Sequence, residues 1–247
     1  MSHILSCSFG KDSIATALTA LQYHEPLDQL IYCDVMFDET CSGEHPEHRQ
    51  FIYEKAIPYF AERGLPTVIL HSSETYVSCF CQTVSRGKGK NKLKSFPLTG
   101  RCIIQRDCKI PPLTAYKKQL PTDTVQYLGI AWDESKRLKR LKENQISLLE
   151  KYKINERAAL QLCQQAGLLS PIYDFAPRGG CWFCPNAKTK ELRHLYDHHP
   201  DLWNRMLALQ ALPNKATERF NRVMTFSEID EMFRWEDRQL SMNDFLL

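Results

Sequence analysis

The chain has 247 residues, of which 43% are hydrophobic and 25% are charged. These proportions are ordinary for a globular protein, so they exclude collagen-like and low-complexity classes. The formal net charge of +3 is nearly neutral, so any binding to nucleic acid must come from local basic clusters. No basic region followed by a long apolar run opens the chain, and no stretch has the length of a membrane span. We therefore expect a cytoplasmic protein with no membrane partner.

The first quarter of the chain alternates between short apolar runs and helical patterns. Apolar runs over residues 4–7 and 30–35 flank a helical pattern over residues 13–23, which is typical of a βαβ unit. A second crossover helix is expected over residues 45–64, from a His-Pro-Glu start to a glycine stop, with a strand over residues 67–71 after it. Parallel strands need covered crossovers, so the pattern predicts an α/β fold with a doubly wound parallel sheet.

The middle of the chain is less regular. Periodicity disappears over residues 72–100, where residues 86–94 hold five cations in nine positions. This basic segment is expected to be a surface loop, either simply solvated or in contact with phosphates. A helix is expected over residues 113–119 and a strand over residues 125–130, and a charged segment over residues 135–142 follows.

Beyond about residue 155 the pattern turns helical. Asn155 is expected to cap a helix over residues 156–166, with Gly167 as its stop. Further helices are expected over residues 189–198, 200–212 and 227–235. We predict two parts, an α/β nucleotide-binding domain over residues 1–150 and a C-terminal helical portion over residues 151–247.

The first strand leads into a glycine-containing loop, Ser8-Phe9-Gly10-Lys11-Asp12-Ser13, which opens the first helix. Such a loop favours anion binding, because Gly10 lets the backbone approach a ligand and a helix start offers unpaired N–H groups. Ser8 and Ser13 can add hydroxyl donors, Lys11 can supply a charge, and Asp12 suits a helix cap or an indirect magnesium ligand. The loop lacks the Gly-x-x-x-x-Gly-Lys-Ser/Thr spacing of a Walker A loop, which disfavours γ-phosphate hydrolysis.

Two later segments strengthen this interpretation. They are Gly129-Ile130-Ala131-Trp132-Asp133-Glu134-Ser135, with Arg137 nearby, and Arg178-Gly179-Gly180-Cys181-Trp182-Phe183-Cys184. Together with the loop, they resemble the PP-loop ATP pyrophosphatases and, more closely, the phosphoadenosine phosphosulfate reductase family. The resemblance reaches to about residue 210 and implies the adenine nucleotide α-hydrolase-like fold. The family's arginine in the first of these segments is Ala131 here, so one phosphate or sulfate contact of the family is missing.

The resemblance implies an adenine nucleotide, ATP with Mg²⁺, as the ligand. Asp34 follows the second expected strand, where the family places an acidic residue beside the nucleotide. The predicted nucleotide-binding residues are Ser8, Phe9, Gly10, Lys11, Asp12, Ser13, Asp34, Gly129, Glu134 and Ser135. Lys11, Asp12 and Arg137 are the candidates for catalysis.

Ten cysteines in a mid-sized chain without a signal peptide point to metal, cluster or catalytic thiols. Cys181 and Cys184 form a Cys-x-x-Cys knuckle that can turn two sulfurs toward one metal. The resemblance adds Cys102 and Cys108, which fall in a segment where iron–sulfur members of the family carry cysteines, although those members usually have two adjacent ones. We therefore predict a four-thiolate site for a four-iron four-sulfur cluster or for zinc, made of Cys102, Cys108, Cys181 and Cys184.

Other roles for these side chains stay open. Cys181 and Cys184 can be structural while Cys102 and Cys108 are free. Cys79 and Cys81 can act as a redox pair or as substitute ligands. Three histidines, His194, His198 and His199, fall at a polar helix end with no arranged carboxylate partner. We expect these histidines to be ordinary surface residues.

As a function, the resemblance implies cleavage of ATP between its α and β phosphates, with AMP left on a carbonyl or similar oxygen. We predict adenylation of a substrate for sulfur transfer, with a nucleic acid as candidate acceptor and a sulfur-donor protein as candidate partner. The basic segment 136–142 can guide a nucleic-acid backbone or is a solvated helix face.

Two alternatives remain. A sulfonucleotide reductase that releases sulfite would need the family's Glu-Cys-Gly-x-His tail, but no cysteine follows Cys184. A non-catalytic, metal-stabilised nucleotide-binding protein would leave the phosphate loop without an evident use.

Overall fold

The computed structural model describes residues 2–96 and 102–244. Within them, one parallel sheet has the strand order β3-β2-β1-β4-β5. The strands are β1 (His3–Ser6), β2 (Gln29–Cys33), β3 (Thr67–Leu70), β4 (Val125–Leu128) and β5 (Gln145–Ile146). The chain moves outward from β1 to β3 and then resumes on the other side of β1, so the predicted doubly wound parallel sheet is confirmed.

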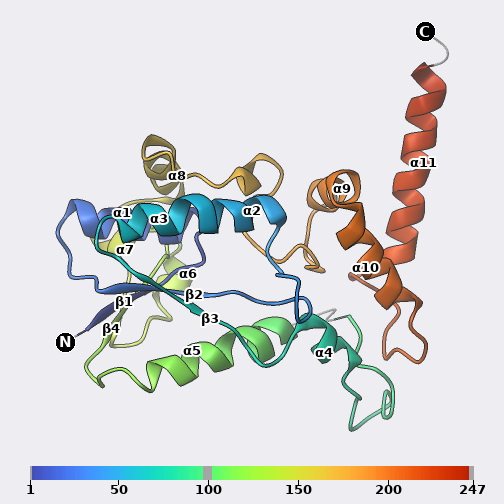
Figure 1. Ribbon diagram of the computed structural model, residues 1–247, viewed down its shortest axis with the longest axis horizontal. Helices are drawn as coiled ribbons and strands as arrows, with labels where there is room; N and C mark the ends of the chain where they lie inside the picture. The colour runs from blue at the N-terminus through green and yellow to red at the C-terminus, as the bar shows by residue number, and fades with distance from the viewer. Residues whose placement is uncertain (1, 97–101, 245–247) are drawn as a thin grey trace.

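The first two crossovers cover one face of the sheet, as Figure 1 shows. Helix α1 (Lys11–Gln22) joins β1 to β2. The second crossover consists of α2 (Pro46–Phe51), a π-helical turn (Ile52–Ala56) and α3 (Ile57–Ala61). The π turn precedes a proline, whose missing N–H interrupts the α-helical hydrogen bonds. Both predicted crossover helices are therefore present.

One helix in the irregular stretch was not predicted. Helix α4 (Tyr76–Cys81) begins with a capping box, in which the Ser78 N–H donates to the Thr75 hydroxyl oxygen at 3.1 Å and the Thr75 N–H donates to the Ser78 hydroxyl oxygen at 2.9 Å. The helix is too short to show a 3.6-residue period in the sequence. After it, residues 86–92 are mostly exposed, in agreement with the predicted surface loop.

The third crossover covers the opposite face of the sheet (Figure 1). It contains a π-helical turn (Gln105–Lys109) that continues into α5 (Ile110–Lys117). Two short helices follow β4, namely α6 (Ser135–Leu138) and α7 (Leu148–Lys151).

Helix α8 (Glu156–Gln165) packs against α1 on the sheet. Its predicted cap is confirmed, because the Asn155 side chain accepts the Ala158 N–H at 2.9 Å, and Gly167 has a φ of 65° beyond its end. This helix lies beyond residue 150 but shares the core of the sheet. The domain boundary at 150 stays a prediction.

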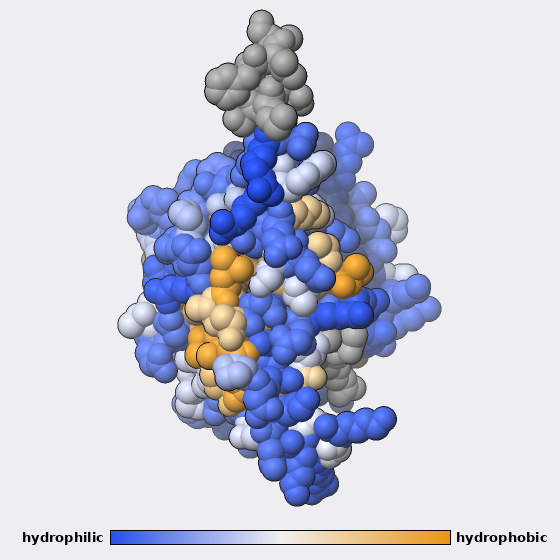
Figure 2. Space-filling model, turned by 90° about the vertical axis from the view of Figure 1, so that its right-hand side faces the viewer, coloured by the Kyte–Doolittle hydropathy of each residue, from blue (hydrophilic) through white to orange (hydrophobic). Residues whose placement is uncertain are grey.

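The C-terminal helices form a group at one end of the sheet (Figure 1). After a 3₁₀ turn (Pro171–Asp174) come α9 (Thr189–His198), α10 (Pro200–Ala211) and α11 (Phe226–Asp244). Seen from their side, the surface is mostly hydrophilic with a narrow apolar strip (Figure 2). None of the helices in the described ranges combines the length and apolarity needed to cross a membrane.

Two hydrophobic clusters hold these parts together. The first lies between the sheet and α1, α3 and α8, and includes Leu5, Ile14 and Phe60. The second joins the segment after β2 to the C-terminal helices and includes Phe37 and Trp182.

Candidate functional site

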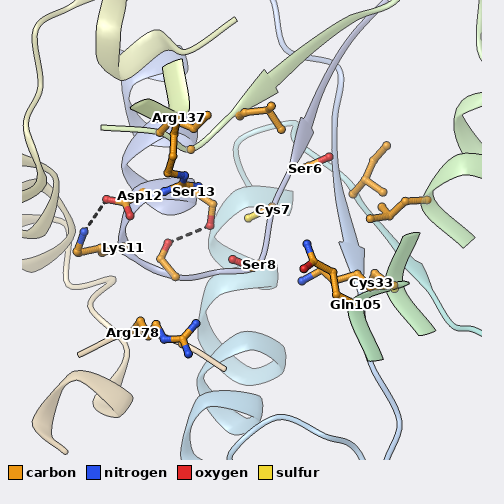
Figure 3. Close-up of a pocket in the computed structure, with 18 of the residues that line it drawn as sticks. Ser6, Cys7, Ser8, Lys11, Asp12, Ser13, Cys33, Gln105, Arg137 and Arg178 are labelled. Atoms are coloured by element: carbon orange, nitrogen blue, oxygen red, sulfur yellow. Dashed lines mark hydrogen bonds and ion pairs between the residues drawn. The ribbon is translucent and has the colours of Figure 1, made fainter. Parts of the chain in front are cut away.

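The strand order places a topological switch point between β1 and β4. In open α/β sheets, ligands bind outside the carboxyl ends of the strands at such a point. A cavity of about 410 Å³ lies here, and Figure 3 shows residues that line it. We call it the loop cavity. The predicted site residues that line it are Ser8, Gly10, Lys11, Asp12, Ser13, Gly129 and Arg137.

The loop after β1 has an unusual backbone. Phe9 has a φ of 54°, in the left-handed region that non-glycine residues seldom adopt. Its side chain is fully buried and packs edge-on against Tyr32, with ring centroids 5.5 Å apart. Packing of Phe9 therefore holds the loop in a strained conformation, a feature that clusters at ligand sites. Phe9 can reach a ligand only through its backbone.

The start of α1 leaves amide donors free for an anion. The first α-helical bond runs from the Ile14 N–H to the Gly10 carbonyl at 3.0 Å, so the Asp12 and Ser13 N–H groups have no acceptor within the helix. The Lys11 N–H donates to the Tyr173 hydroxyl at 2.7 Å, which ties the loop to the turn after α8. The remaining amides lie at the positive end of the helix and favour a phosphate.

The charged side chains of the loop pair with one another. The Lys11 ammonium lies 2.8 Å from an Asp12 carboxylate oxygen and 3.6 Å from the Glu156 carboxylate. Burial raises the pKa of Asp12, and the Lys11 ammonium opposes that rise. Arg137 and Arg178 approach the cavity from opposite sides in Figure 3. The cavity thus holds a net excess of cationic groups around the helix start.

Gly129 shapes the cavity by its lack of a side chain. A Cβ at this position would lie 2.7 Å from the Ser13 nitrogen and 2.8 Å from the Asp12 carbonyl carbon. Such contacts are too short for real atoms, so only glycine lets the end of β4 approach the start of α1 this closely.

Glu134 orients Arg137. Its carboxylate oxygens lie 2.6 and 2.7 Å from one Arg137 nitrogen, and one of them also accepts the Ala131 N–H at 3.1 Å. Glu134 and Ser135 do not line the loop cavity, whereas Arg137 does.

Asp34 lies directly after β2, and its contact with a nucleotide stays a prediction. It is 1% exposed, and its carboxylate accepts hydrogen bonds from the Ser42 hydroxyl at 2.7 Å and the Tyr53 hydroxyl at 3.2 Å. It does not line the loop cavity. Its position after β2 is the predicted one, but its hydrogen bonds stabilise the turn that follows the strand.

A second cavity of about 360 Å³, the cysteine cavity, adjoins the first. Cys102, Cys181 and Cys184 all line it. The two cavities have lining residues in common, namely Ser8, Gln105, Lys109, Arg178 and Gly179. The phosphate loop and the three thiols therefore line adjoining cavities.

The cysteine knuckle is anchored by its own tryptophan. The Cys184 N–H donates to the Cys181 carbonyl at 3.0 Å, which closes the turn. The Trp182 backbone N–H donates to the Gly43 carbonyl at 3.0 Å, and its indole N–H donates to the Ser42 carbonyl at 2.9 Å. These bonds join the knuckle to the segment after β2.

Burial raises the pKa of both knuckle thiols. The nearby Lys109 ammonium opposes this at Cys181, and the Arg178 guanidinium opposes it at Cys184. Two cations thus lie where bound thiolates would carry negative charge.

Cys108, the fourth predicted thiolate, does not line the cysteine cavity. It is fully buried, with its sulfur 3.7 Å from that of Cys79. Gln105 and Lys109 line both cavities, whereas Cys108 and Cys79 belong to the second hydrophobic cluster. Cys79 is buried whereas Cys81 is exposed, so these two do not share an environment.

Several lining residues had no role in the sequence interpretation. Tyr173 and Arg178 fall in or beside the quoted motifs, which was the available signal for them. His48 gave no signal, because a single histidine on a helix is common. It is buried, with Nδ1 2.8 Å from the Ser170 hydroxyl and Nε2 3.3 Å from the Ser8 carbonyl oxygen, so it supports the phosphate loop.

The expectation that the three C-terminal histidines lack a carboxylate partner is wrong. Glu47, at the start of α2, lies beside His194 and His199. The two segments are about 150 residues apart, and the pairing depends on the packing of α9 against α2, which no local pattern reports.

Comparisons with known proteins identify no family for this chain. Neither the known protein families nor the curated proteins gave a match. Among solved structures, the chain is similar to the "U34-tRNA thiolase NcsA from Methanococcus maripaludis with its [4Fe-4S] cluster", with 18% identity and a TM-score of 0.42. The match covers 86% of this chain and 72% of that chain. A likeness this distant does not identify a substrate or a cofactor.

Proposed function

We propose that this protein is a PP-loop enzyme of the phosphoadenosine phosphosulfate reductase family, which binds ATP with Mg²⁺ and adenylates an acceptor for sulfur transfer. The main support is the connection between the loop cavity and the cysteine cavity. Lys109 and Arg178 line both, so an acceptor activated in one cavity lies next to the thiols of the other. We propose a nucleic acid as acceptor, with the exposed basic segments 86–94 and 136–142 as contacts for its backbone.

The loop cavity suits a nucleotide in size and charge. Ligand cavities commonly measure ~300–1,000 Å³, and this one measures about 410 Å³. The free amides at the start of α1 can bind the leaving phosphates, and Lys11, Arg137 and Arg178 can offset their charge.

The reaction is a displacement at the α-phosphorus. An acceptor oxygen forms a bond to that phosphorus, and the bond from the α-phosphorus to the oxygen that bridges it to the β-phosphorus breaks. Pyrophosphate leaves with the electron pair and Mg²⁺. Donors placed around the developing charge and fixed alignment of the two reactants are the main sources of rate in phosphoryl and nucleotidyl transfer.

The donor set of the cysteine cavity fits a metal centre. Three thiols from two segments can each bind one iron of a four-iron four-sulfur cluster. In the described part of the chain, they do not form a group whose ligand atoms all lie within 4.8 Å of one another, as the ligands of one zinc ion must. Cluster ligands bind separate irons, so they lie farther apart than the ligands of a single ion. Lys109 and Arg178 beside the thiols offset the charge of bound thiolates. When bound, such a centre supplies a place to hold the sulfur that is transferred.

Sulfonucleotide reduction has weaker support. A reductase needs a thiolate that can reach the sulfate, and two cysteines, Cys7 and Cys33, do line the loop cavity. Both are buried, and burial raises the pKa of each thiol to about 11. These thiols stay protonated at neutral pH and are poor nucleophiles.

The products of ATP distinguish the functions. The protein is incubated anaerobically with ATP, Mg²⁺, sulfide as the sulfur donor and unfractionated small RNA from cells that lack it, and nucleotides and pyrophosphate are quantified. Sulfide displaces AMP from the adenylated acceptor, so each cycle releases one AMP and one pyrophosphate. We expect AMP and pyrophosphate in equal amounts with little ADP, and little sulfite from phosphoadenosine phosphosulfate with a thiol reductant. ADP as the main product would contradict adenylation, and robust sulfite release would favour the reductase.

A further inference from the structure

A cluster of nitrogen and oxygen donors lies where α2 meets α9 and α10. Glu47 is in the first turn of α2, His194 is in α9, and His199 joins α9 to α10. The Nε2 atoms of His194 and His199 lie 2.8 and 2.7 Å from the same carboxylate oxygen, Glu47 Oε1. One ligand atom from each residue lies within 4.8 Å of the other two.

Part of the donor capacity in this region is unused. The other carboxylate oxygen, Glu47 Oε2, is buried and accepts no hydrogen bond from another described residue. The Nδ1 atom of His45, two residues earlier, is also buried without a partner among the described residues. Buried polar atoms nearly always have a hydrogen-bond partner, so two unpartnered atoms in one short segment indicate a missing ligand.

The histidine rings are held in place before any ligand binds. The His194 ring stacks on Phe175 at 3.6 Å with an interplanar angle of 7°, and on its other neighbour His198 at 4.3 Å. The His45 ring packs edge-on against the same phenylalanine, at 5.3 Å. Side chains fixed in this way lose little freedom when they bind a metal, which favours binding.

We propose that Glu47, His194 and His199 bind one Zn²⁺ ion, which fastens the C-terminal helices to α2. Two imidazoles and a carboxylate are an established donor set for zinc, with Zn–N and Zn–O distances near ~2.1 Å. A tetrahedral ion holds its ligand atoms about 3.4 Å apart at those distances, so each of the two Nε2 atoms must move away from Glu47 Oε1 by less than about 1 Å. Each imidazole binds the metal as the neutral tautomer with its proton on Nδ1, so an imidazolium loses its Nε2 proton to solvent and a neutral ring exchanges its Nε2 proton for one on Nδ1.

The role of this site is structural. None of the three residues lines the loop cavity or the cysteine cavity. The ion would link segments about 150 residues apart, and on the same helix His48 supports the phosphate loop. Metal binding at this point therefore stabilises the contact between α2 and the C-terminal helices, independently of the proposed function.

The test compares Glu47→Gln and His199→Asn with the matched control His198→Asn. His198 is the exposed neighbour whose ring stacks on His194 but which is outside the donor set. Each protein is stripped with a chelator and dialysed against Zn²⁺, and zinc per chain and melting temperature are measured with and without the metal. Wild type and the control should bind one more zinc per chain than the other two variants, and zinc should raise their melting temperature more.

Cobalt distinguishes this site from the cysteines. Co²⁺ bound to thiolates gives an intense charge-transfer band in the near ultraviolet, whereas nitrogen and oxygen ligands give visible bands alone. When wild type is titrated with Co²⁺, one equivalent of the metal should increase the visible absorbance without increasing the near-ultraviolet thiolate band. Equal zinc content and equal thermal response in all four proteins would overturn the proposal. If the variants fail to fold, wild type in which every bound cobalt shows the thiolate band would also overturn it.

Discussion

The loop cavity and the cysteine cavity adjoin, yet they are built in different ways. Consecutive residues after β1 form most of the phosphate loop, and its backbone is held by Phe9 on Tyr32 and by hydrogen bonds to Tyr173 and His48. The cysteine cavity combines Cys102 with the knuckle that starts at Cys181, and Trp182 fixes that knuckle in the second hydrophobic cluster. The first site thus depends on local backbone geometry, whereas the second depends on packing between distant segments.

The largest effect is expected from Trp182→Ala, which removes the packing that holds the cysteine cavity together. Trp182 is 1% exposed and packs on Phe37 with ring centroids 4.6 Å apart. Loss of such a side chain costs about 3–5 kcal/mol, and the knuckle also loses its indole hydrogen bond. Urea unfolding and metal analysis should show lower stability and less metal at the cysteines. The exposed Trp235 serves as control, and its change to alanine should alter stability by about 0.5 kcal/mol or less.

A smaller effect is expected from Gly129→Ala, which disturbs the backbone of the loop cavity. The added Cβ collides with the start of α1, and overpacking of this kind costs about 1–3 kcal/mol. Because the strain falls on the Asp12 and Ser13 amides, ATP affinity measured by calorimetry should fall more than tenfold. Gly180→Ala is the control, since its Cβ would meet nothing within 4 Å. Normal ATP binding by the Gly129 variant would contradict the assignment of the loop.

These two sites also mark how far the sequence could be interpreted. Strand and crossover periods predicted the sheet and most helices, but α4 and the two-residue strand β5 are too short to produce a period. The phosphate loop was predicted because its function is encoded in adjacent residues. Two outcomes were not available from the sequence. Cys108 packs on Cys79 in the second hydrophobic cluster, and α9 brings His194 to Glu47.

The smallest effect on folding is expected from Lys11→Met, which removes one charge from the loop cavity. Lys11 lines this cavity, pairs with Asp12 and belongs to neither hydrophobic cluster, so the fold should persist. A hydrogen bond to a charged group contributes about 1.5–3 kcal/mol, and ATP should therefore bind roughly 10- to 100-fold more weakly. Calorimetry with ATP and Mg²⁺ measures this, and Lys55→Met on the exposed side of the second crossover is the control. Equal ATP affinity in both variants would remove Lys11 from the site.

The connection between the two cavities is tested most directly by Cys102→Ser, because Cys102 is exposed while it lines the cysteine cavity. Cys81→Ser is the matched control, an exposed cysteine outside both cavities. The measurement follows pyrophosphate release and ³⁵S incorporation into RNA in the same anaerobic reaction with ATP, Mg²⁺ and ³⁵S-labelled sulfide. We predict that Cys102→Ser still releases pyrophosphate but incorporates little sulfur, while Cys81→Ser does both as wild type does. Sulfur incorporation by Cys102→Ser at the wild-type rate would contradict a shared site for adenylation and sulfur transfer.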